Sequence, residues 1–171
     1  MRIPCSILLL ALAMLAAVRL PAAEPKRLTI VDYFVKLPDQ TLEIPAPEML
    51  KFIQRAKDTI IDTANGYMKG RGDGAQGDIE VALFRYKDDH PLLALLQGEP
   101  GENDYWYLDF YEMGDDGKMR KVDRKILKPI NEPRRKFDLP RKGRTIVVRD
   151  TKSGKVEGQW TWDGAKFVAE K

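Results

Sequence analysis

Apolar and polar positions follow a helical period before the middle of the chain. Within residues 47–64 the apolar side chains recur every three or four positions; they are Met49, Ile53, Ala56 and Ile60. This spacing places them on one helical face, and Pro47 suits the first turn of a helix. Asn65-Gly66 is a typical stop signal. We therefore predict an amphipathic helix over 47–64.

From Asp78 onward the period changes to two, which is typical of strands. The predicted strands cover residues 79–84, 92–96, 105–111, 118–127, 145–149, 156–162 and 167–169. Short turns separate most of them, which favours antiparallel pairing, and residues 128–144 form a Pro- and Arg-rich connector. The helix must bury its apolar face, and the sheet is the available partner. The predicted fold class is α+β, with one amphipathic helix packed on a mostly antiparallel sheet of about seven strands.

Residues 28–37 precede this helix and fit either a strand or a short helix. Thr29 lies three positions before Asp32, in the arrangement of a capping box. This pair favours a helical turn.

An uninterrupted apolar segment occupies residues 7–18, after a short basic start and before small residues at 22–23. Twelve residues rise about 18 Å as a helix, less than a hydrocarbon core of about 30 Å. The segment is therefore typical of a cleaved export signal. We expect residues 1–23 to be a signal peptide and 24–171 to be a single domain, periplasmic or secreted, with no transmembrane span.

Loss of the leader changes the composition and limits the chemistry. Without Arg2 and Arg19, 29 basic residues become 27 against 26 acidic ones, and the net charge falls from +3 to about +1. Cys5 leaves with the leader, so no disulfide is expected. Ser153 and His90 are the serine and the histidine that remain, and they lie in separate predicted turns. A Ser-His nucleophile, a zinc site and any other cofactor are therefore not expected.

Five of the twelve residues from Gly66 to Gly77 are glycine. A calcium loop would need oxygen ligands where Lys69 and Arg71 stand, so no metal is predicted. The glycines can carry the chain from helix to sheet by adopting positive φ. Alternatively, the loop shapes a ligand cleft, with Tyr67 and Asp73 as candidate contacts.

The segment 105–111 alternates two sets of side chains. The set predicted to face the core is Trp106, Leu108 and Phe110, and the opposite set is Tyr105, Tyr107, Asp109 and Tyr111. Tyrosines on an open face suit a sugar or peptide ligand. In the alternative, the connector or a neighbouring chain covers that face.

Charge is segregated along the sequence. Residues 78–116 carry a local charge of −9, and residues 118–144 carry +9. Strands from the two blocks can pair and neutralise each other. Alternatively, the second block forms a basic patch for an anionic partner, with nucleic acid not expected; its candidate residues are Arg134, Arg135, Lys136 and Arg141.

Several short strings resemble small exported bacterial proteins of uncharacterised function. They are Asp32-Tyr-Phe-x-x-Leu-Pro38, Asp62-x-x-Asn-Gly-Tyr67, Gly72-Asp-Gly74, Val81-Ala-Leu-Phe84 and Trp162-Asp-Gly-x-Lys-Phe167. The resemblance implies an envelope or secreted α+β domain and brings no catalytic residue with it.

The expected function is a non-enzymatic binding or accessory domain for a glycan, peptide or protein. One alternative is a carboxylate-based hydrolase, because glycoside cleavage needs two carboxyl groups; its candidates are Asp73, Asp104, Asp109 and Glu112. Another alternative is a structural or assembly role in the envelope.

Overall fold

The computed structural model describes residues 27–72, 77–99, 105–122, 127 and 134–170, so the predicted leader lies outside the described residues. Within these ranges there are two helices, α1 (Ile30–Phe34) and α2 (Ala46–Arg55). The strands of the same ranges are β1 (Ile60–Asp62), β2 (Tyr67–Gly70), β3 (Asp78–Arg85), β4 (Pro91–Glu99), β5 (Tyr105–Met113), β6 (Met119–Lys121), β7 (Arg135–Asp138), β8 (Thr145–Asp150), β9 (Val156–Trp162) and β10 (Phe167–Ala169).

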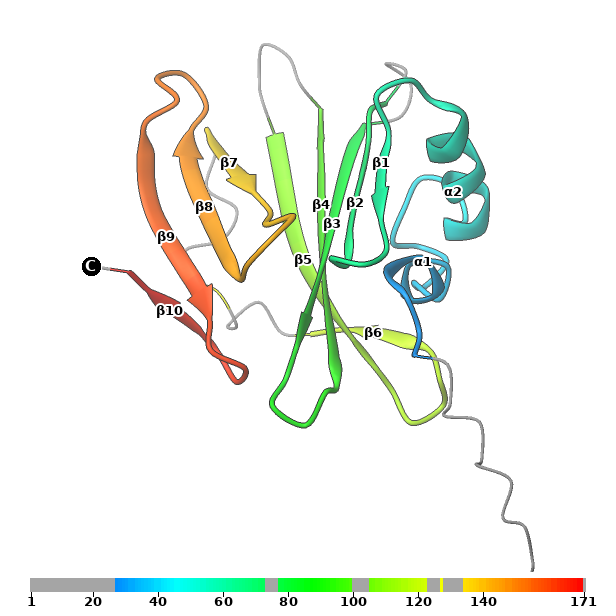
Figure 1. Ribbon diagram of the computed structural model, residues 1–171. Helices are drawn as coiled ribbons and strands as arrows, with labels where there is room; N and C mark the ends of the chain where they lie inside the picture. The colour runs from blue at the N-terminus through cyan, green and yellow to red at the C-terminus, as the bar shows by residue number, and fades with distance from the viewer. Residues whose placement is uncertain (1–26, 73–76, 100–104, 123–126, 128–133, 171) are drawn as a thin grey trace, which may run out of the picture.

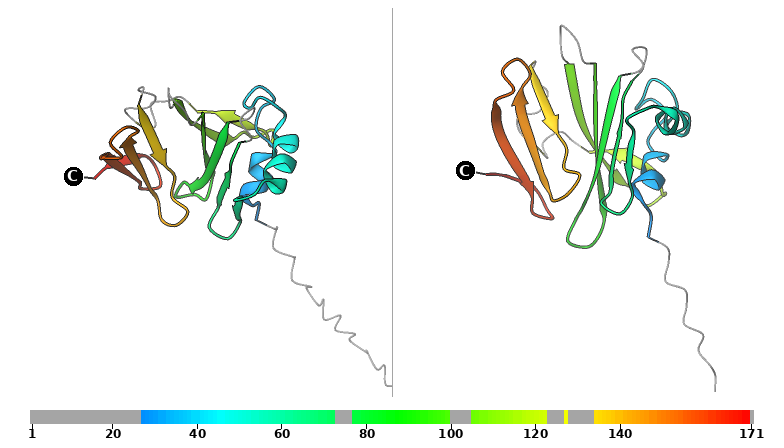
Figure 2. Two further views of the ribbon diagram at one scale, coloured as in Figure 1. Left: turned by 90° about the horizontal axis from the view of Figure 1, so that it is seen from above. Right: turned by 45° about the horizontal axis from the view of Figure 1, so that its top comes forward.

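The strands form two antiparallel sheets. One sheet contains β1 to β6 in chain order, and the other has the order β10-β9-β8-β7. The helices cover one face of the six-stranded sheet, and the four-stranded sheet lies against its other face (Figure 1, Figure 2). Antiparallel pairing is thus confirmed. The prediction of about seven strands in one sheet is wrong, because the described residues form ten strands in two sheets.

Two apolar clusters fill the spaces on either side of the six-stranded sheet. The cluster beneath the helices includes Phe34, Ile53 and Leu95, and the cluster between the sheets includes Leu96 and Trp162. Because β4 contributes to both clusters, every side chain of 92–96 is fully buried. The six-stranded sheet is therefore an inner layer of the molecule.

The predicted helix over 47–64 is too long, because α2 ends at Arg55. Ala56 is extended and Asp58 has φ 63°, so the chain leaves the helical conformation there. Ile60 and Ile61 then pair with β2 instead of continuing the helix. An apolar pair next to an amphipathic helix suits a further helical turn or a strand. Pairing with β2 makes Ile60 and Ile61 a strand.

The capping box predicted at the first helix is confirmed. The Thr29 side chain accepts from the Asp32 N–H, and the Asp32 carboxylate accepts from the Thr29 N–H at 2.8 Å. These bonds satisfy backbone donors that a helix start leaves unpaired. They fix where the chain enters α1.

Two glycines of the segment 66–77, Gly66 and Gly70, have structural roles. Gly66 has φ 64° in the β1–β2 turn. A Cβ at Gly70 would lie 2.8 Å from the Ile53 side chain, so glycine lets α2 pack closely on β2. Asp73 lies outside the described residues.

The strand predicted at 118–127 is shorter, since β6 ends at Lys121 and residues 123–126 are outside the described ranges. The predicted connector at 128–144 contains a strand, β7, that pairs with β8. Its one buried apolar residue, Phe137, is too weak a signal for a period-two pattern. Among the described helices, none is long and apolar enough to cross a membrane.

Candidate functional site

The predicted tyrosine face is mostly covered. Tyr107 is half exposed, but Tyr111 is 3% exposed and belongs to the cluster beneath the helices. Tyr105 is the first residue of β5. The prediction that Tyr111 lies on an open surface is wrong, because α1 and its flanking chain cover this end of the sheet.

Tyr67 lies on the opposite face of the sheet, in the cluster between the two sheets. Burial, and next to it the Glu80 carboxylate, raises the pKa of its phenol far above the ordinary value. The same carboxylate accepts a hydrogen bond from the Leu139 N–H at 3.2 Å, which joins the two sheets. Tyr67 is therefore part of a buried joint between the sheets.

The two candidate hydrolase carboxylates that lie in the described residues, Asp109 and Glu112, do not converge. Asp109 lies opposite Leu95, on the helix side, and Lys121 Nζ is 2.6 Å from its carboxylate. Glu112 lies on the other face of β5 and accepts a hydrogen bond from the Tyr86 hydroxyl. Asp73 and Asp104 lie outside the described residues. Since one strand directs Asp109 and Glu112 to opposite faces, they cannot act on one substrate bond.

The predicted basic edge is divided between several partners. Arg135 Nε donates to Glu157 at 2.7 Å, and Lys136 Nζ lies 4.9 Å from the centroid of the Trp106 ring. Arg134 is exposed and has φ 72°. Pairing between the acidic and basic blocks is seen between Asp109 and Lys121. These contacts leave no continuous basic edge along β7.

A cleft of about 420 Å³ lies at the end of the sheets that carries the β1–β2 turn and the β7–β8 loop. Four segments that are distant in sequence line it. Its residues are Arg27, Leu28, Thr29, Thr63, Ala64, Asn65, Gly66, Leu83, Phe84, Arg85, Gly143 and Arg144. The cleft therefore exists only in the folded chain, and three of its lining residues are arginines.

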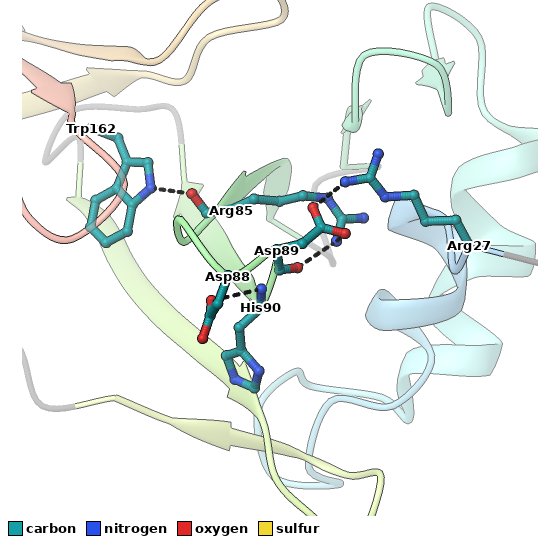
Figure 3. A network of polar contacts seen from close by, with 6 residues as sticks. All are labelled: Arg27, Arg85, Asp88, Asp89, His90 and Trp162. Atoms are coloured by element: carbon teal, nitrogen blue, oxygen red, sulfur yellow. Dashed lines mark hydrogen bonds and ion pairs between the residues drawn. The ribbon is translucent and has the colours of Figure 1, made fainter. Parts of the chain in front are cut away.

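Arg85 is the anchored member of the three. Its guanidinium lies over the Tyr33 ring, 5.9 Å from the centroid, and Nη1 donates to the Asp89 carbonyl oxygen at 3.0 Å. The Arg85 carbonyl accepts from the Trp162 indole N–H at 2.7 Å (Figure 3). The side chain of Arg85 is 19% exposed. Because contacts hold both its guanidinium and its backbone carbonyl, the side chain is well positioned.

Asp89 joins Arg85 to Arg27. Its carboxylate pairs with the Arg27 guanidinium and lies 3.6 Å from Arg85 Nη1, as Figure 3 shows. Asp88 beside it accepts from the His90 backbone N–H at 3.1 Å and does not join this pairing. One carboxylate is thus shared by two guanidiniums.

Arg144 lines the opposite side of the cleft. Its backbone carbonyl accepts a hydrogen bond from the backbone N–H of Trp162 at 2.9 Å, and this bond fixes the end of the β7–β8 loop. Its side chain is exposed and makes no hydrogen bond or ion pair to any residue that the structure describes. Arg144 is therefore the guanidinium available to a ligand.

The β1–β2 turn and the β7–β8 loop are also tied by an ion pair. Arg141 Nε lies 2.8 Å from the Asp62 carboxylate, which also accepts two hydrogen bonds from Asn65. The Asn65 bonds, followed by Arg141, lower the pKa of Asp62 to about 2. Arg141, one of the predicted binding residues, therefore lies beside the cleft.

The charge at this end of the molecule is positive. Among the described residues at and beside the cleft are four arginines and three carboxylates; they are Arg27, Arg85, Arg141 and Arg144 with Asp32, Asp62 and Asp89. Guanidiniums bind carboxylate and phosphate groups with paired hydrogen bonds. In the part of the chain that the structure describes, no three His, Cys, Asp or Glu side chains form a metal-binding group. The arrangement suits the binding of an anion.

Comparisons with protein-family models, with curated proteins and with solved structures found no match to this chain. The described residues form a two-sheet antiparallel domain with an arginine-lined cleft. Sequence reasoning missed Arg27, Arg85 and Arg144, since isolated arginines in different segments give no local pattern. The fold alone brings them together.

Proposed function

We propose that this protein is an exported, non-enzymatic binding or accessory domain. It holds an anionic group of a glycan, peptide or protein in the cleft between the β1–β2 turn and the β7–β8 loop. The observation that carries the proposal is that three arginines line this cleft while one carboxylate, Asp89, pairs with two of them. The periplasm or the exterior of the cell is the proposed location, on the evidence of the apolar leader at 7–18.

The cleft has the features of a binding site rather than of a catalytic one. Arg85 is held in place by Tyr33 and by backbone bonds, so binding requires little ordering of that side chain. Arg144 makes no hydrogen bond or ion pair within the described residues that a ligand would have to replace. A charge-assisted hydrogen bond from such a group contributes about 1.5–3 kcal/mol.

Isothermal titration calorimetry with citrate tests the cleft. Arg144→Gln removes one guanidinium without breaking a hydrogen bond or ion pair among the described residues, so the protein is expected to fold normally and to bind citrate about tenfold more weakly. Lys152→Gln is the matched control, because Lys152 is exposed in the turn at the other end of β8 and the charge change is the same. Equal citrate affinity in wild type and Arg144→Gln would refute the proposal.

The proposed location has its own test, which is independent of the cleft. When the gene is expressed in a bacterium, protein recovered from the periplasm or medium is expected to begin near Glu24 by mass spectrometry. Intact chain starting at Met1 and found in the cytosol would contradict export.

A further inference from the structure

Asp89 occupies an unusual backbone position for a residue with a side chain. It is the fourth of the five residues that connect β3 to β4 and has φ 69°, with its N–H bonded to the Tyr86 carbonyl at 3.1 Å. Hairpin loops of this length usually carry glycine at the left-handed position. Aspartate tolerates that conformation better than most residues but gains nothing from it. The turn therefore does not explain why this position carries a carboxylate, and the contacts of that carboxylate lie outside the turn.

That carboxylate is directed at the two arginines on one side of the cleft. It pairs with Arg27 and lies 3.6 Å from Arg85 Nη1 (Figure 3). We propose that Asp89 is an internal counter-ion for Arg27 and Arg85, and that the ligand carries a carboxylate which displaces it. This inference rests on the proposed function of the cleft as an anion site.

The contact is weak enough to be exchanged. The Arg27 and Asp89 side chains are 64% and 58% exposed, and exposed ion pairs are readily replaced by competing ions. Arg85 keeps its stacking on Tyr33 and its bond to the Asp89 backbone carbonyl when the Asp89 carboxylate moves away. An incoming anion thus meets a positioned guanidinium.

The identity of the internal group indicates the class of ligand. Arg27 and Arg85 already stand at the separation that one planar carboxylate can bridge. A ligand carboxylate can take this place once the Asp89 side chain moves away, and Arg144, which lines the same cleft, offers a guanidinium to a second anionic group of the ligand. We therefore infer a ligand with two carboxylates, such as an acidic peptide segment or an acidic glycan.

The test compares glutarate, a dicarboxylate, with inorganic phosphate by calorimetry. Asp89→Asn and Asp89→Gly both suit a positive φ and remove the competing carboxylate. Each is expected to bind glutarate about three- to tenfold more tightly than wild type. Asp88→Asn, which makes the same charge change one residue away without an arginine partner, is expected to change affinity by less than about twofold.

The variants at Arg144 and Asp89 test the anion site and the counter-ion role separately. If Arg144→Gln leaves citrate binding unchanged, the anion site itself is refuted. If Arg144→Gln weakens glutarate binding, yet Asp89→Asn binds glutarate no more tightly than Asp88→Asn does, the counter-ion role alone is refuted. A larger gain for phosphate than for glutarate in Asp89→Asn would overturn the carboxylate assignment.

Discussion

The six-stranded sheet is covered on both faces, whereas the four-stranded sheet is covered on one. In β4 every residue from 92 to 96 is buried, but in β8 the buried Ile146 and Val148 alternate with half-buried neighbours. A sheet between two layers needs apolar side chains on both faces, and a sheet with one wet face needs them at every second position. The comparison indicates that the six-stranded sheet contributes more to the free energy of unfolding than the four-stranded sheet does.

The open face of the outer sheet is held by polar contacts instead. Thr145 and Thr161 are hydrogen-bonded across β8 and β9 at 2.6 Å, and Arg149 Nε lies 2.6 Å from the Asp138 carboxylate. Exposed ion pairs contribute little stability. Arg144, which directly precedes β8 of the outer sheet, lines the cleft, so the proposed binding site draws on the less stabilised part of the fold.

The largest difference between the sheets is expected from truncation of an apolar side chain. Leu95→Ala empties a fully buried position beneath the helices and is expected to cost about 2–5 kcal/mol of unfolding free energy. Val147→Ala on the outer face of β8 is expected to cost about 1 kcal/mol or less. Urea denaturation measures both values. Similar losses for the two variants would show that the outer face is also packed.

A smaller difference is expected at two glycines that lie beneath tryptophan rings. A Cβ at Gly98 would lie 2.2 Å from the body of the Trp106 ring, and one at Gly158 would lie 2.4 Å from the far edge of the Trp160 ring. Gly98→Ala must shift a ring packed between the sheets and is expected to cost about 1–3 kcal/mol.

Gly158→Ala is expected to cost less than about 1 kcal/mol, since Trp160 can swing its far edge away. Thermal unfolding of the two variants, followed by near-ultraviolet circular dichroism of the tryptophans, makes the comparison. If Gly158→Ala proved the more damaging, Trp160 would be the more constrained ring.

The smallest effect concerns the ion pair that links the two sheets beside the cleft. The pKa of Asp62 is lowered from the ordinary 3.8 to about 2, so its contribution to stability is present above pH 3.8 and is lost as the pH falls toward 2. Arg141→Gln is expected to raise this pKa only part of the way, because the Asn65 hydrogen bonds are the larger cause. A carboxyl NMR titration measures the shift. An Asp62 pKa that stays near 2 in the variant would remove Arg141 from the explanation.

The sequence was informative where one period continued over several residues. Strands β3, β5, β8 and β9 follow clear alternation, and the Thr29–Asp32 capping box marks α1. Ile60 and Ile61 were misassigned because an apolar pair beside a helix fits both periods, and only pairing with β2 decides between them. The second sheet was missed because alternation reports burial on a face without saying which layer provides it.

The candidate site was less predictable than the fold. Tyr111 shares a strand face with Tyr107, but α1 covers one end of that face and leaves the other open. Arg141 was predicted as a basic contact and does lie beside the cleft. Arg85 and Arg144 come together through long-range packing, which the spacing of residues along the chain does not encode.

The arginine side chains themselves give the most direct test of the anion cleft. In a citrate titration followed by NMR, the Nε–Hε signals of Arg27, Arg85 and Arg144 are expected to move together and to saturate with one dissociation constant, since these residues line one cleft. The signal of Arg149, on the outer face of β8, is expected to stay in place. Unsaturated drift of all arginine signals, or saturation at Arg149 instead, would contradict a binding site between the β1–β2 turn and the β7–β8 loop.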